Sequence, residues 1–222
     1  MALSLYGLKE WLLATVIAGA IVVIAIAIGW WWISIPIGII WIAALAFFRD
    51  PLGRRPATEA PRDMVSPADG RISAVERVEH HEAVDGPAVI VRIFLSVLDV
   101  HINRAPCDAT VKSLVYRPGK HLDARSEESA RVNESNLIMM ELGTGERIGV
   151  RQVSGAIARR IVCPLQGGDT LQRAQRFGMI KFGSTTELIL PDRGDQGPTV
   201  HVAKGDRVRG AVTILASLDS TS

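Results

Sequence analysis

His101 is the histidine with the strongest signal for chemistry. It follows the apolar run Val89–Leu98 and stands in the segment Asp99-Val100-His101-Ile102-Asn103-Arg104-Ala105-Pro106. A polar side chain at the end of a buried strand must find hydrogen-bond partners, so a structural histidine is the default interpretation. Its surroundings of Asp, Asn and Arg leave a chemical role open.

The other four histidines carry weaker signals. His80 and His81 lie in a charged stretch that predicts a solvated loop, and His201 follows a turn rich in Gly and Asp. His121 ends the segment Arg117-Pro118-Gly119-Lys120-His121, a turn with clustered positive charge. That turn could help to hold an anionic headgroup, but spacing alone favours a solvated surface.

Two glycine-containing segments complete the candidates. In Ser66-Pro67-Ala68-Asp69-Gly70-Arg71-Ile72, an Asp followed by Gly ahead of a strand predicts a turn. In Arg176-Phe177-Gly178-Met179-Ile180-Lys181-Phe182-Gly183-Ser184-Thr185, Gly-Ser-Thr between apolar segments predicts a loop. Neither segment is specific when it is taken alone.

Metal, nucleotide and disulfide chemistry have no support in the sequence. No spacing of ligand residues indicates a metal site, and there is no P-loop and no GxGxxG motif. Cys107 and Cys163 lie 56 positions apart without a CxxC, which predicts two buried thiols rather than a disulfide framework.

The composition excludes further classes of protein. The 222 residues include 25 Lys and Arg against 23 Asp and Glu, a net charge of +2, so a strongly basic nucleic-acid binder is excluded. With 48% hydrophobic and 22% charged residues, the chain is also not a disordered protein.

An uncharged stretch near the N-terminus predicts a membrane anchor. No Asp, Glu, Lys or Arg occurs from Trp11 to Phe48, 38 residues that would form a helix of about 57 Å against a hydrocarbon core of roughly 30 Å. Two spans fit better, with a turn around Gly29–Pro36 where three tryptophans suit the interface. Lys9 before the pair and Arg49 after it place both ends on the cytoplasmic side.

Two alternatives for this stretch stay open. Ala44-Leu45-Ala46 has the small residues of a signal-peptide cleavage site, but the apolar run is far longer than the hydrophobic region of a signal peptide. A single tilted span or a re-entrant segment is the other alternative.

The rest of the chain predicts a β-rich domain. We expect an anchor over residues 1–48, a linker rich in Pro and Arg over 49–63 and a catalytic domain over 64–222. Short runs bounded by turn residues predict the strands, and one short stretch, Ser126–Val132, predicts a helix. The predicted strands are Arg71–Val78, Ala88–Leu95, Ala109–Tyr116, Leu137–Leu142, Ile148–Val153, Ile157–Val162, Glu187–Leu190 and Val208–Leu215.

A weak repeat supports a barrel-sandwich-like fold. Gly168-Asp169-Thr170-Leu171 and Gly205-Asp206-Arg207-Val208 share the pattern Gly-Asp-x-apolar. Each predicts a tight turn that enters a strand, because Gly allows a positive φ and Asp caps the turn. Lipoyl and biotinyl carriers use turns of this kind, so a membrane-anchored carrier or adaptor without enzymatic activity is one hypothesis for function.

Taken together, the segments resemble the phosphatidylserine decarboxylase family, in the short form found in bacteria and archaea. The resemblance runs from the anchor to about Leu218, and the order and spacing of its segments make it specific. The segments are Phe48-Arg49-Asp50-Pro51, Ser66-Pro67-Ala68-Asp69-Gly70, Asp99–Pro106, Asn133-Glu134-Ser135-Asn136, Ile157-Ala158-Arg159-Arg160-Ile161-Val162 and Arg176–Ser184.

The resemblance implies that the proenzyme cleaves itself between Gly183 and Ser184, into a beta chain (1–183) and an alpha chain (184–222). Ser184 would attack the carbonyl of Gly183, and elimination would leave a pyruvoyl group formed covalently from Ser184. The family pattern nominates His101 as the base and Asp69 as the group that orients it, in the logic of a serine triad.

The resemblance also implies the reaction. The pyruvoyl ketone would form a Schiff base with phosphatidylserine in the membrane, and loss of CO2 would give phosphatidylethanolamine, with no metal and no dissociable cofactor. Diacyl phosphatidylserine is the expected substrate, and archaeal ether-lipid serine is the alternative. A relative that has lost self-processing is disfavoured by the intact Ser184, His101 and Asp69, and association into a homo-oligomer is left open.

One position departs from the family pattern. Longer members carry a second histidine where this chain has Arg104, and an arginine cannot act as a base near neutral pH. Either His101 performs both proton transfers or the roles are divided differently. Arg104, Lys120 and His121 are the candidates for contact with the substrate, and each has a solvated surface charge as its alternative.

Overall fold

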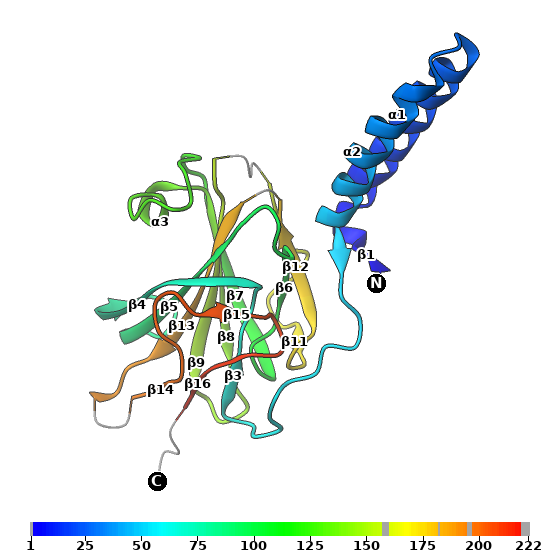
Figure 1. Ribbon diagram of the computed structural model, residues 1–222. Helices are drawn as coiled ribbons and strands as arrows, with labels where there is room; N and C mark the ends of the chain where they lie inside the picture. Colours follow the sequence, from blue (N-terminus) through cyan, green and yellow to red (C-terminus); the bar gives the residue numbers. More distant parts are fainter. Residues whose placement is uncertain (1, 157–159, 182, 195–196, 219–222) are drawn as a thin grey trace. The chain divides into compact units, whose positions relative to one another are not determined.

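The computed structural model describes residues 2–156, 160–181, 183–194 and 197–218 of the chain. It divides into two compact units, Met1–Leu52 and Gly53–Ser222. The first unit is helical and the second is built almost entirely of strands (Figure 1).

The first unit is a helical hairpin. Its elements are β1 (Ala2–Leu3), η1 (Leu5–Gly7), α1 (Leu8–Ala27), η2 (Trp31–Ile33), α2 (Ser34–Phe47) and β2 (Arg49–Asp50). β1 pairs with β2, so the two ends of the hairpin meet. Gly29 turns the chain with a φ of +81°, and Nε1 of Trp41 on α2 donates to Oγ1 of Thr15 on α1 at 3.0 Å.

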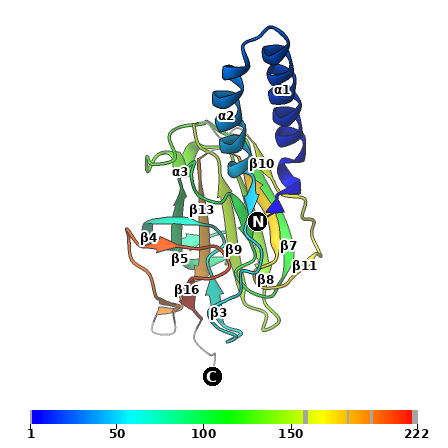
Figure 2. The ribbon, with the colours of Figure 1, turned by 45° about the vertical axis from the view of Figure 1, so that its right-hand side comes forward.

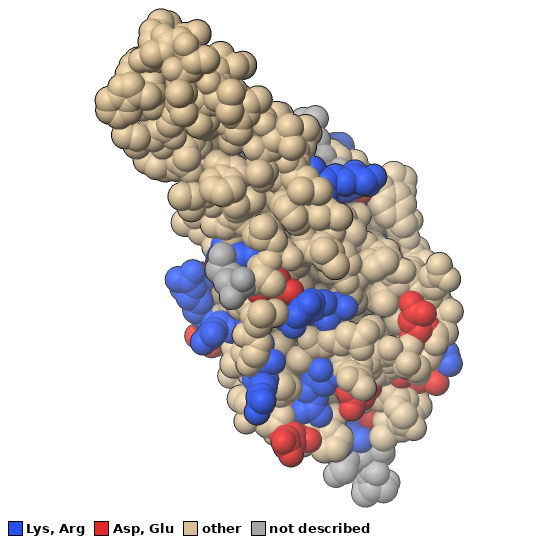
Figure 3. All heavy atoms as spheres, turned by 90° about the vertical axis from the view of Figure 1, so that its right-hand side faces the viewer, with Lys and Arg blue, Asp and Glu red and all other residues tan. Residues whose placement is uncertain are grey.

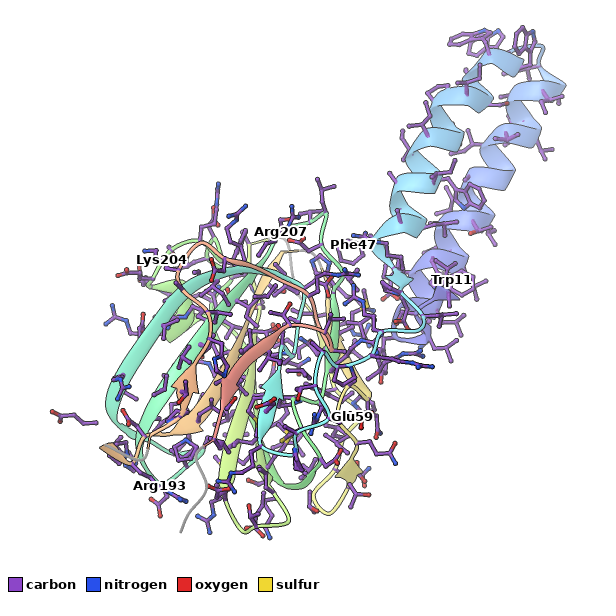
Figure 4. The ribbon with its side chains drawn as sticks, turned by 60° about the horizontal axis from the view of Figure 1, so that its bottom comes forward. Trp11, Phe47, Glu59, Arg193, Lys204 and Arg207 are labelled. Atoms are coloured by element: carbon purple, nitrogen blue, oxygen red, sulfur yellow. The ribbon has the colours of Figure 1, made fainter. Side chains whose placement is uncertain are left out.

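The outer surface of this hairpin is apolar. The continuous helical segment Leu5–Ala27 is apolar enough and long enough to cross a membrane. Val16 and Ile39, for example, are 68% and 64% exposed. An exposed apolar surface of this kind is typical of a segment that contacts a membrane or another protein. Figure 3 shows the hairpin without Lys, Arg, Asp or Glu over most of its visible length, and Figure 4 labels Trp11 and Phe47 near the end where its two strands pair.

The second unit is organised by one antiparallel sheet of eight strands, in the order β11-β7-β8-β9-β13-β5-β4-β15. Figures 1 and 2 show this sheet curling into half of a barrel. The strands are β4 (Gly70–His81), β5 (Gly86–Leu95), β7 (Ala109–Arg117), β8 (Ser135–Glu141), β9 (Arg147–Val153), β11 (Thr170–Leu171), β13 (Ser184–Pro191) and β15 (Arg207–Val208).

Two three-stranded sheets complete this unit. One contains β10 (Ile161–Val162), β12 (Arg176–Ile180) and β6 (Ile102–Arg104), and the other contains β14 (Thr199–Val200), β16 (Ile214–Ser217) and β3 (Asp63–Val65). A single turn of helix, α3 (Ser129–Val132), lies between β7 and β8. In the view of Figure 4, Lys204 and Arg207 lie at one end of the unit and Arg193 lies at the other.

The core is centred on β13. This strand lies between β5 and β9, and every residue from Ser184 to Leu190 is buried. Val91, Ile93, Val150 and Leu188 belong to the main hydrophobic cluster and are 0% exposed. The second half of β13, Leu188–Leu190, is apolar, whereas its first four residues, Ser184–Glu187, are polar and are buried as well.

The predicted β-rich class is confirmed, with three differences in detail. Val208–Leu215 is two short strands, β15 and β16, because a turn around Ala211 (φ +66°) interrupts the run. Only the last four residues of the predicted helix, Ser129–Val132, are helical. Of the predicted strand Ile157–Val162, Ile161–Val162 forms β10, and 157–159 lie outside the described residues.

The two Gly-Asp turns occur where the repeat predicts them. Gly168 and Gly205 have φ values of +96° and +101°. Asp169 accepts a hydrogen bond from the backbone nitrogen of Gln166, and Asp206 accepts one from Ala203, both at 2.8 Å. Each turn leads directly into a strand, β11 or β15.

Candidate functional site

Ser184 is the first residue of β13 and lies at the centre of the candidate site. Its backbone pairs with Leu95 of β5, and its side chain is 0% exposed. Its Oγ has no hydrogen-bond partner among the described residues. A buried hydroxyl without a hydrogen-bond partner costs about 1–3 kcal/mol of stability. The unpartnered Oγ of Ser184 therefore calls for an explanation, and a role in chemistry is one.

Gly183 precedes Ser184 with a left-handed backbone. Its φ is +67°, a value that L-residues with a Cβ adopt at a cost. Space is not the constraint, because the nearest atom to an added Cβ would be Cγ2 of Val97 at 4.0 Å. The conformation of the chain immediately before Ser184 is therefore what requires glycine here.

His101 lies against the backbone of Gly183. Its Nε2 accepts a hydrogen bond from the Gly183 backbone nitrogen at 3.2 Å, and its Nδ1 is 2.9 Å from the carbonyl oxygen of Asp99. A carbonyl can only accept and a peptide N–H can only donate, so both contacts assign the proton to Nδ1 and a lone pair to Nε2. The histidine therefore presents a basic nitrogen to the residue before Ser184.

A tight turn fixes the carbonyl that orients His101. The Oδ2 atom of Asp99 accepts hydrogen bonds from the backbone nitrogen and the Oγ of Ser96, at 2.9 and 2.7 Å. This holds the backbone of the turn between β5 and His101. In the sequence, Asp99 is only a charged neighbour of His101. The structure gives it a role, because its side chain closes the turn and its backbone carbonyl contacts the His101 ring.

Asp69 has partners of its own. Its carboxylate forms two hydrogen bonds with the guanidinium of Arg54 and accepts a third from the backbone nitrogen of Gly210 at 2.9 Å. The side chains of Arg54 and Asp69 are 7% and 13% exposed. In this structure a backbone carbonyl, and not Asp69, contacts the Nδ1 of His101.

The carbonyl of Gly183 is packed tightly against Gly155. A Cβ added to Gly155 would lie 2.3 Å from the Gly183 carbonyl oxygen and 3.2 Å from Cβ of Ala124, so only glycine fits. Asn133 fixes this neighbourhood: its amide nitrogen donates to the carbonyls of Leu122 and Ser154 at 2.9 and 2.8 Å. Gly155 was not among the predicted site residues, because a glycine that permits close packing has no side-chain signature.

A cavity of about 370 Å³ opens beside Gly183. Residues of two loops, Ser96–Val97 and Asp123–Arg125, line it together with Ala156. Arg125 pairs with Asp123 at 2.6 Å, and both side chains are largely exposed. The cavity therefore offers one positive and one negative group next to the Gly183–Ser184 junction.

The three predicted substrate-binding residues are not among the described residues that line this cavity. Arg104 is buried and donates from Nη1 to the carbonyl of Ala174 at 3.1 Å. His121 lies closer to the site, because its Nδ1 is 3.2 Å from Oγ of Ser154, the neighbour of Gly155. Lys120 is exposed, and its backbone pairs with Val132 and Glu134.

The fold and the site define a class of protein: a β-rich unit in which a histidine nitrogen contacts the glycine of a Gly-Ser junction whose serine is buried. The model of the family described as phosphatidylserine decarboxylase matches residues 42–216. The phosphatidylserine decarboxylase proenzyme of Desulfotalea psychrophila is 40% identical over 174 residues, 78% of each chain. The proenzyme of Ralstonia nicotianae is 40% identical over 195 residues, covering 88% of this chain and 86% of its own. The proenzyme of Neisseria meningitidis serogroup B is 38% identical over 200 residues, 90% of this chain and 72% of its own.

This chain belongs to the phosphatidylserine decarboxylase family. The expectation from the sequence segments is confirmed at the level of the family, and the matches cover most of the chain. Nothing favours the carrier or adaptor hypothesis. A carrier needs an accessible lysine for modification, and Lys181, near the Gly-Ser junction, is only 5% exposed.

Proposed function

We propose that this chain is a proenzyme that cleaves itself between Gly183 and Ser184 and then decarboxylates phosphatidylserine. The observation that supports this most directly is the Gly183–Ser184 junction itself. A buried hydroxyl without a partner among the described residues follows a left-handed glycine, and the basic nitrogen of His101 contacts that glycine. The names of the relatives support the same reaction.

The cleavage and the formation of the pyruvoyl group need only groups of the chain and one molecule of water. Oγ of Ser184 attacks the carbonyl carbon of Gly183, the peptide C–N bond breaks, and an ester replaces the amide. Removal of the Cα proton of residue 184 and loss of the Gly183 carboxylate from Cβ then break the ester. Water replaces nitrogen at the resulting dehydroalanine, ammonia leaves, and a pyruvoyl group caps the shorter chain. We assign the proton transfers to Nε2 of His101, and such a group typically contributes about 10²–10⁴-fold.

The residues around Ser184 fit this prosthetic group. The junction borders a cavity, and its buried hydroxyl has no competing partner among the described residues. The pyruvoyl group supplies an amine-reactive ketone and an electron sink for decarboxylation. We propose that the cavity beside Gly183 receives the serine headgroup, with Arg125 as the cation for its carboxylate or phosphate.

The three substrate contacts expected from the sequence, Arg104, Lys120 and His121, stay proposals. His121 is the best placed of them, because it contacts Ser154 next to Gly155. Arg104 would have to act from a buried position, and Lys120 from an exposed one. Arg125, which lines the cavity, is therefore the cation that we favour for the headgroup.

Asp69 stays the proposed group that orients His101. Its carboxylate would then have to exchange Arg54 for His101 during processing, because Arg54 and Gly210 occupy it here. His101 is the proposed general acid in the second reaction as well, since Arg104 stands where a second histidine is expected and is buried against Ala174.

The helical unit is the proposed membrane anchor, with residues 49–63 as a linker and 64–222 as the catalytic domain. One helix is long and apolar enough to span, and α2 is apolar but shorter. The basic residues Lys9, Arg49, Arg54 and Arg55 flank the hairpin, so we propose that the catalytic domain faces the cytoplasm. A two-chain lipid stays in the bilayer, and an anchor confines the enzyme to the same surface.

After cleavage, the two chains are proposed to stay together through β13. This strand belongs to the shorter chain and pairs with β5 and β9 of the longer one. Glu187 of β13 is buried between Arg92 and Arg151, at 2.7 and 3.0 Å. Burial of Arg92 opposes its charge, but the Glu187 and Glu76 carboxylates outweigh this and raise its pKa.

The first test is intact mass spectrometry of the detergent-purified chain beside Ser184→Ala. We expect two masses for the wild type, broken after Gly183, with a carbonyl on the shorter chain that reacts with a hydrazide probe, and one full-length mass for the variant. A single full-length mass for a folded wild type would overturn self-cleavage. Release of CO2 from vesicles containing diacyl phosphatidylserine, compared with vesicles of the ether-linked lipid, then tests the substrate.

A further inference from the structure

A chain of side-chain hydrogen bonds crosses the core next to the site. Nδ2 of Asn136 donates to Oε1 of Gln152 at 3.2 Å, and Nε2 of Gln152 donates to Oδ1 of Asn103 at 2.9 Å. Nδ2 of Asn103 then donates to Oγ1 of Thr186 at 3.0 Å. We call these four residues the amide ladder.

The amide ladder is buried throughout. Gln152, Asn103 and Thr186 are 0% exposed, and Asn136 is 6% exposed. Buried amides that lose a partner are costly, so a ladder of this kind has one favoured arrangement. It therefore restricts how the strands that carry it can shift.

The ladder joins two different sheets. Gln152 of β9 is in register with both Asn136 of β8 and Thr186 of β13, within the eight-stranded sheet. Asn103 lies on β6, which pairs by its backbone with β12 in a three-stranded sheet. The Asn103–Thr186 hydrogen bond is thus a direct tie between β6 and β13, strands that do not pair through their backbones.

β13 begins at the proposed nucleophile, and β6 begins directly after the proposed base, His101. Asn103 follows His101 by two residues, and Thr186 follows Ser184 by two residues. Because alternate residues of a strand share a face, Ser184 and Thr186 point to the same side of β13. A tie between residues 103 and 186 therefore limits how far the chain segments at residues 101 and 184 can move apart.

We infer that the amide ladder positions His101 for the cleavage of the Gly183–Ser184 bond, an inference that rests on the proposed self-cleavage. Asn103 and Thr186 are positioning residues: they act through the placement of His101 and Ser184 and take no part in bond making. Thr186 becomes the third residue of the shorter chain, so the same ladder holds the new chain end against β6 after cleavage.

A matched pair of substitutions at one position tests this inference. Thr186→Val keeps the shape of the side chain and removes the hydroxyl, whereas Thr186→Ser keeps the hydroxyl and removes a methyl group. The measurement is the rate at which pulse-labelled full-length chain in membranes converts to the 1–183 chain. We expect Thr186→Val to slow conversion about 10- to 100-fold and Thr186→Ser to stay within a few-fold of the wild type.

Controls separate positioning from loss of stability. Val111→Ala is a core substitution on β7, a strand that carries no ladder residue, and is expected to lower the melting temperature without slowing conversion. If Thr186→Val does not fold, Gln152→Met takes its place, because it removes the next two hydrogen bonds at similar volume, and slowing of about 3- to 10-fold is expected.

The outcomes distinguish the inference from the proposed function. Conversion of Thr186→Val, or of Gln152→Met in its place, at the wild-type rate would overturn the inference while leaving self-cleavage intact. Equal slowing by Thr186→Ser and Thr186→Val would also overturn it, since the hydroxyl would then not matter. A folded wild-type chain that never converts would overturn the proposed self-cleavage itself.

Discussion

The backbone nitrogen of Gly183 donates a hydrogen bond to Nε2 of His101 at 3.2 Å. The two residues are 82 positions apart in the chain, and the contact places a basic nitrogen one residue before the proposed cleavage site. The carbonyl of Asp99 at 2.9 Å from Nδ1 holds the ring in the tautomer that this contact needs. Loss of the basic nitrogen should therefore affect cleavage directly.

Replacing His101 with Gln should block self-cleavage. A Gln can accept the Gly183 N–H but cannot remove a proton, so the conversion rate should fall by about 10²–10⁴-fold. The rate of conversion of full-length chain, followed by mass, is the measurement. His201→Gln, at an exposed histidine, is the matched control and should convert normally. Normal conversion of His101→Gln would remove His101 from the proposed mechanism.

Gly155→Ala should slow cleavage without removing any reacting group. Its Cβ would lie 2.3 Å from the carbonyl oxygen of Gly183, so that carbonyl must move. A displacement on the order of 1 Å can cost about 100-fold in rate, and we expect an effect of that size. Gly143→Ala, where an added Cβ meets no atom within 4 Å, is the control. Equal conversion rates for the two variants would show that the packing at Gly155 is irrelevant to cleavage.

Asp69 and Arg54 can be told apart by their effects on cleavage. If Asp69 orients His101, Asp69→Asn should slow conversion at least about 10-fold more than Arg54→Met, because loss of an orienting carboxylate is costly. Breaking this buried pair should destabilise both variants, by about 3–5 kcal/mol. Conversion rates are measured beside denaturant unfolding of each variant on a Ser184→Ala background. If the two variants convert at equal rates and are equally stable, the Asp69–Arg54 pair has only a structural role and Asp69 does not orient His101.

Glu187→Gln should destabilise the catalytic unit. Two arginines, Arg92 and Arg151, would lose the buried carboxylate that both contact, and such a loss costs about 3–5 kcal/mol. Urea unfolding of the uncleaved Ser184→Ala chain measures it. Glu141→Gln, which breaks an exposed pair with Lys112, should cost no more than about 1 kcal/mol. A similar cost for both variants would contradict the importance of burial here.

Acid should weaken the second unit through His81. Its Nδ1 accepts a hydrogen bond from the backbone nitrogen of Ala83 at 3.1 Å, and burial, followed by the charge of Arg151, lowers its pKa below 6.5. The folded state therefore favours the neutral ring, so its contribution to stability is present above pH 6.5 and is lost as the pH falls through the lowered pKa. Unfolding of wild type and His81→Asn between pH 8 and about 5 checks this. The free energy of unfolding should fall less with acid in His81→Asn than in the wild type. Parallel curves of unfolding free energy against pH would exclude His81 as the cause of the acid effect.

The sequence determined the features that are local or periodic. The uncharged run from Trp11 to Phe48 forms the apolar hairpin, and the two Gly-Asp turns lead into strands as their residues predict. Alternation and turn residues located most strands of the large sheet, because these signals are set by neighbours in the chain. The family was also accessible from the order and spacing of its segments.

Only the tertiary structure decided which distant residues meet. The short strands β6 and β12 give no periodic signal, yet they bring His101 to Gly183 and Asn103 to Thr186. Asp69 pairs with Arg54 rather than with His101 in this structure, a choice that spacing cannot reveal. The close packing of Gly155 on the Gly183 carbonyl was invisible for the same reason: contacts between segments depend on how sheets pack in space, and a single sequence records the segments without their distances.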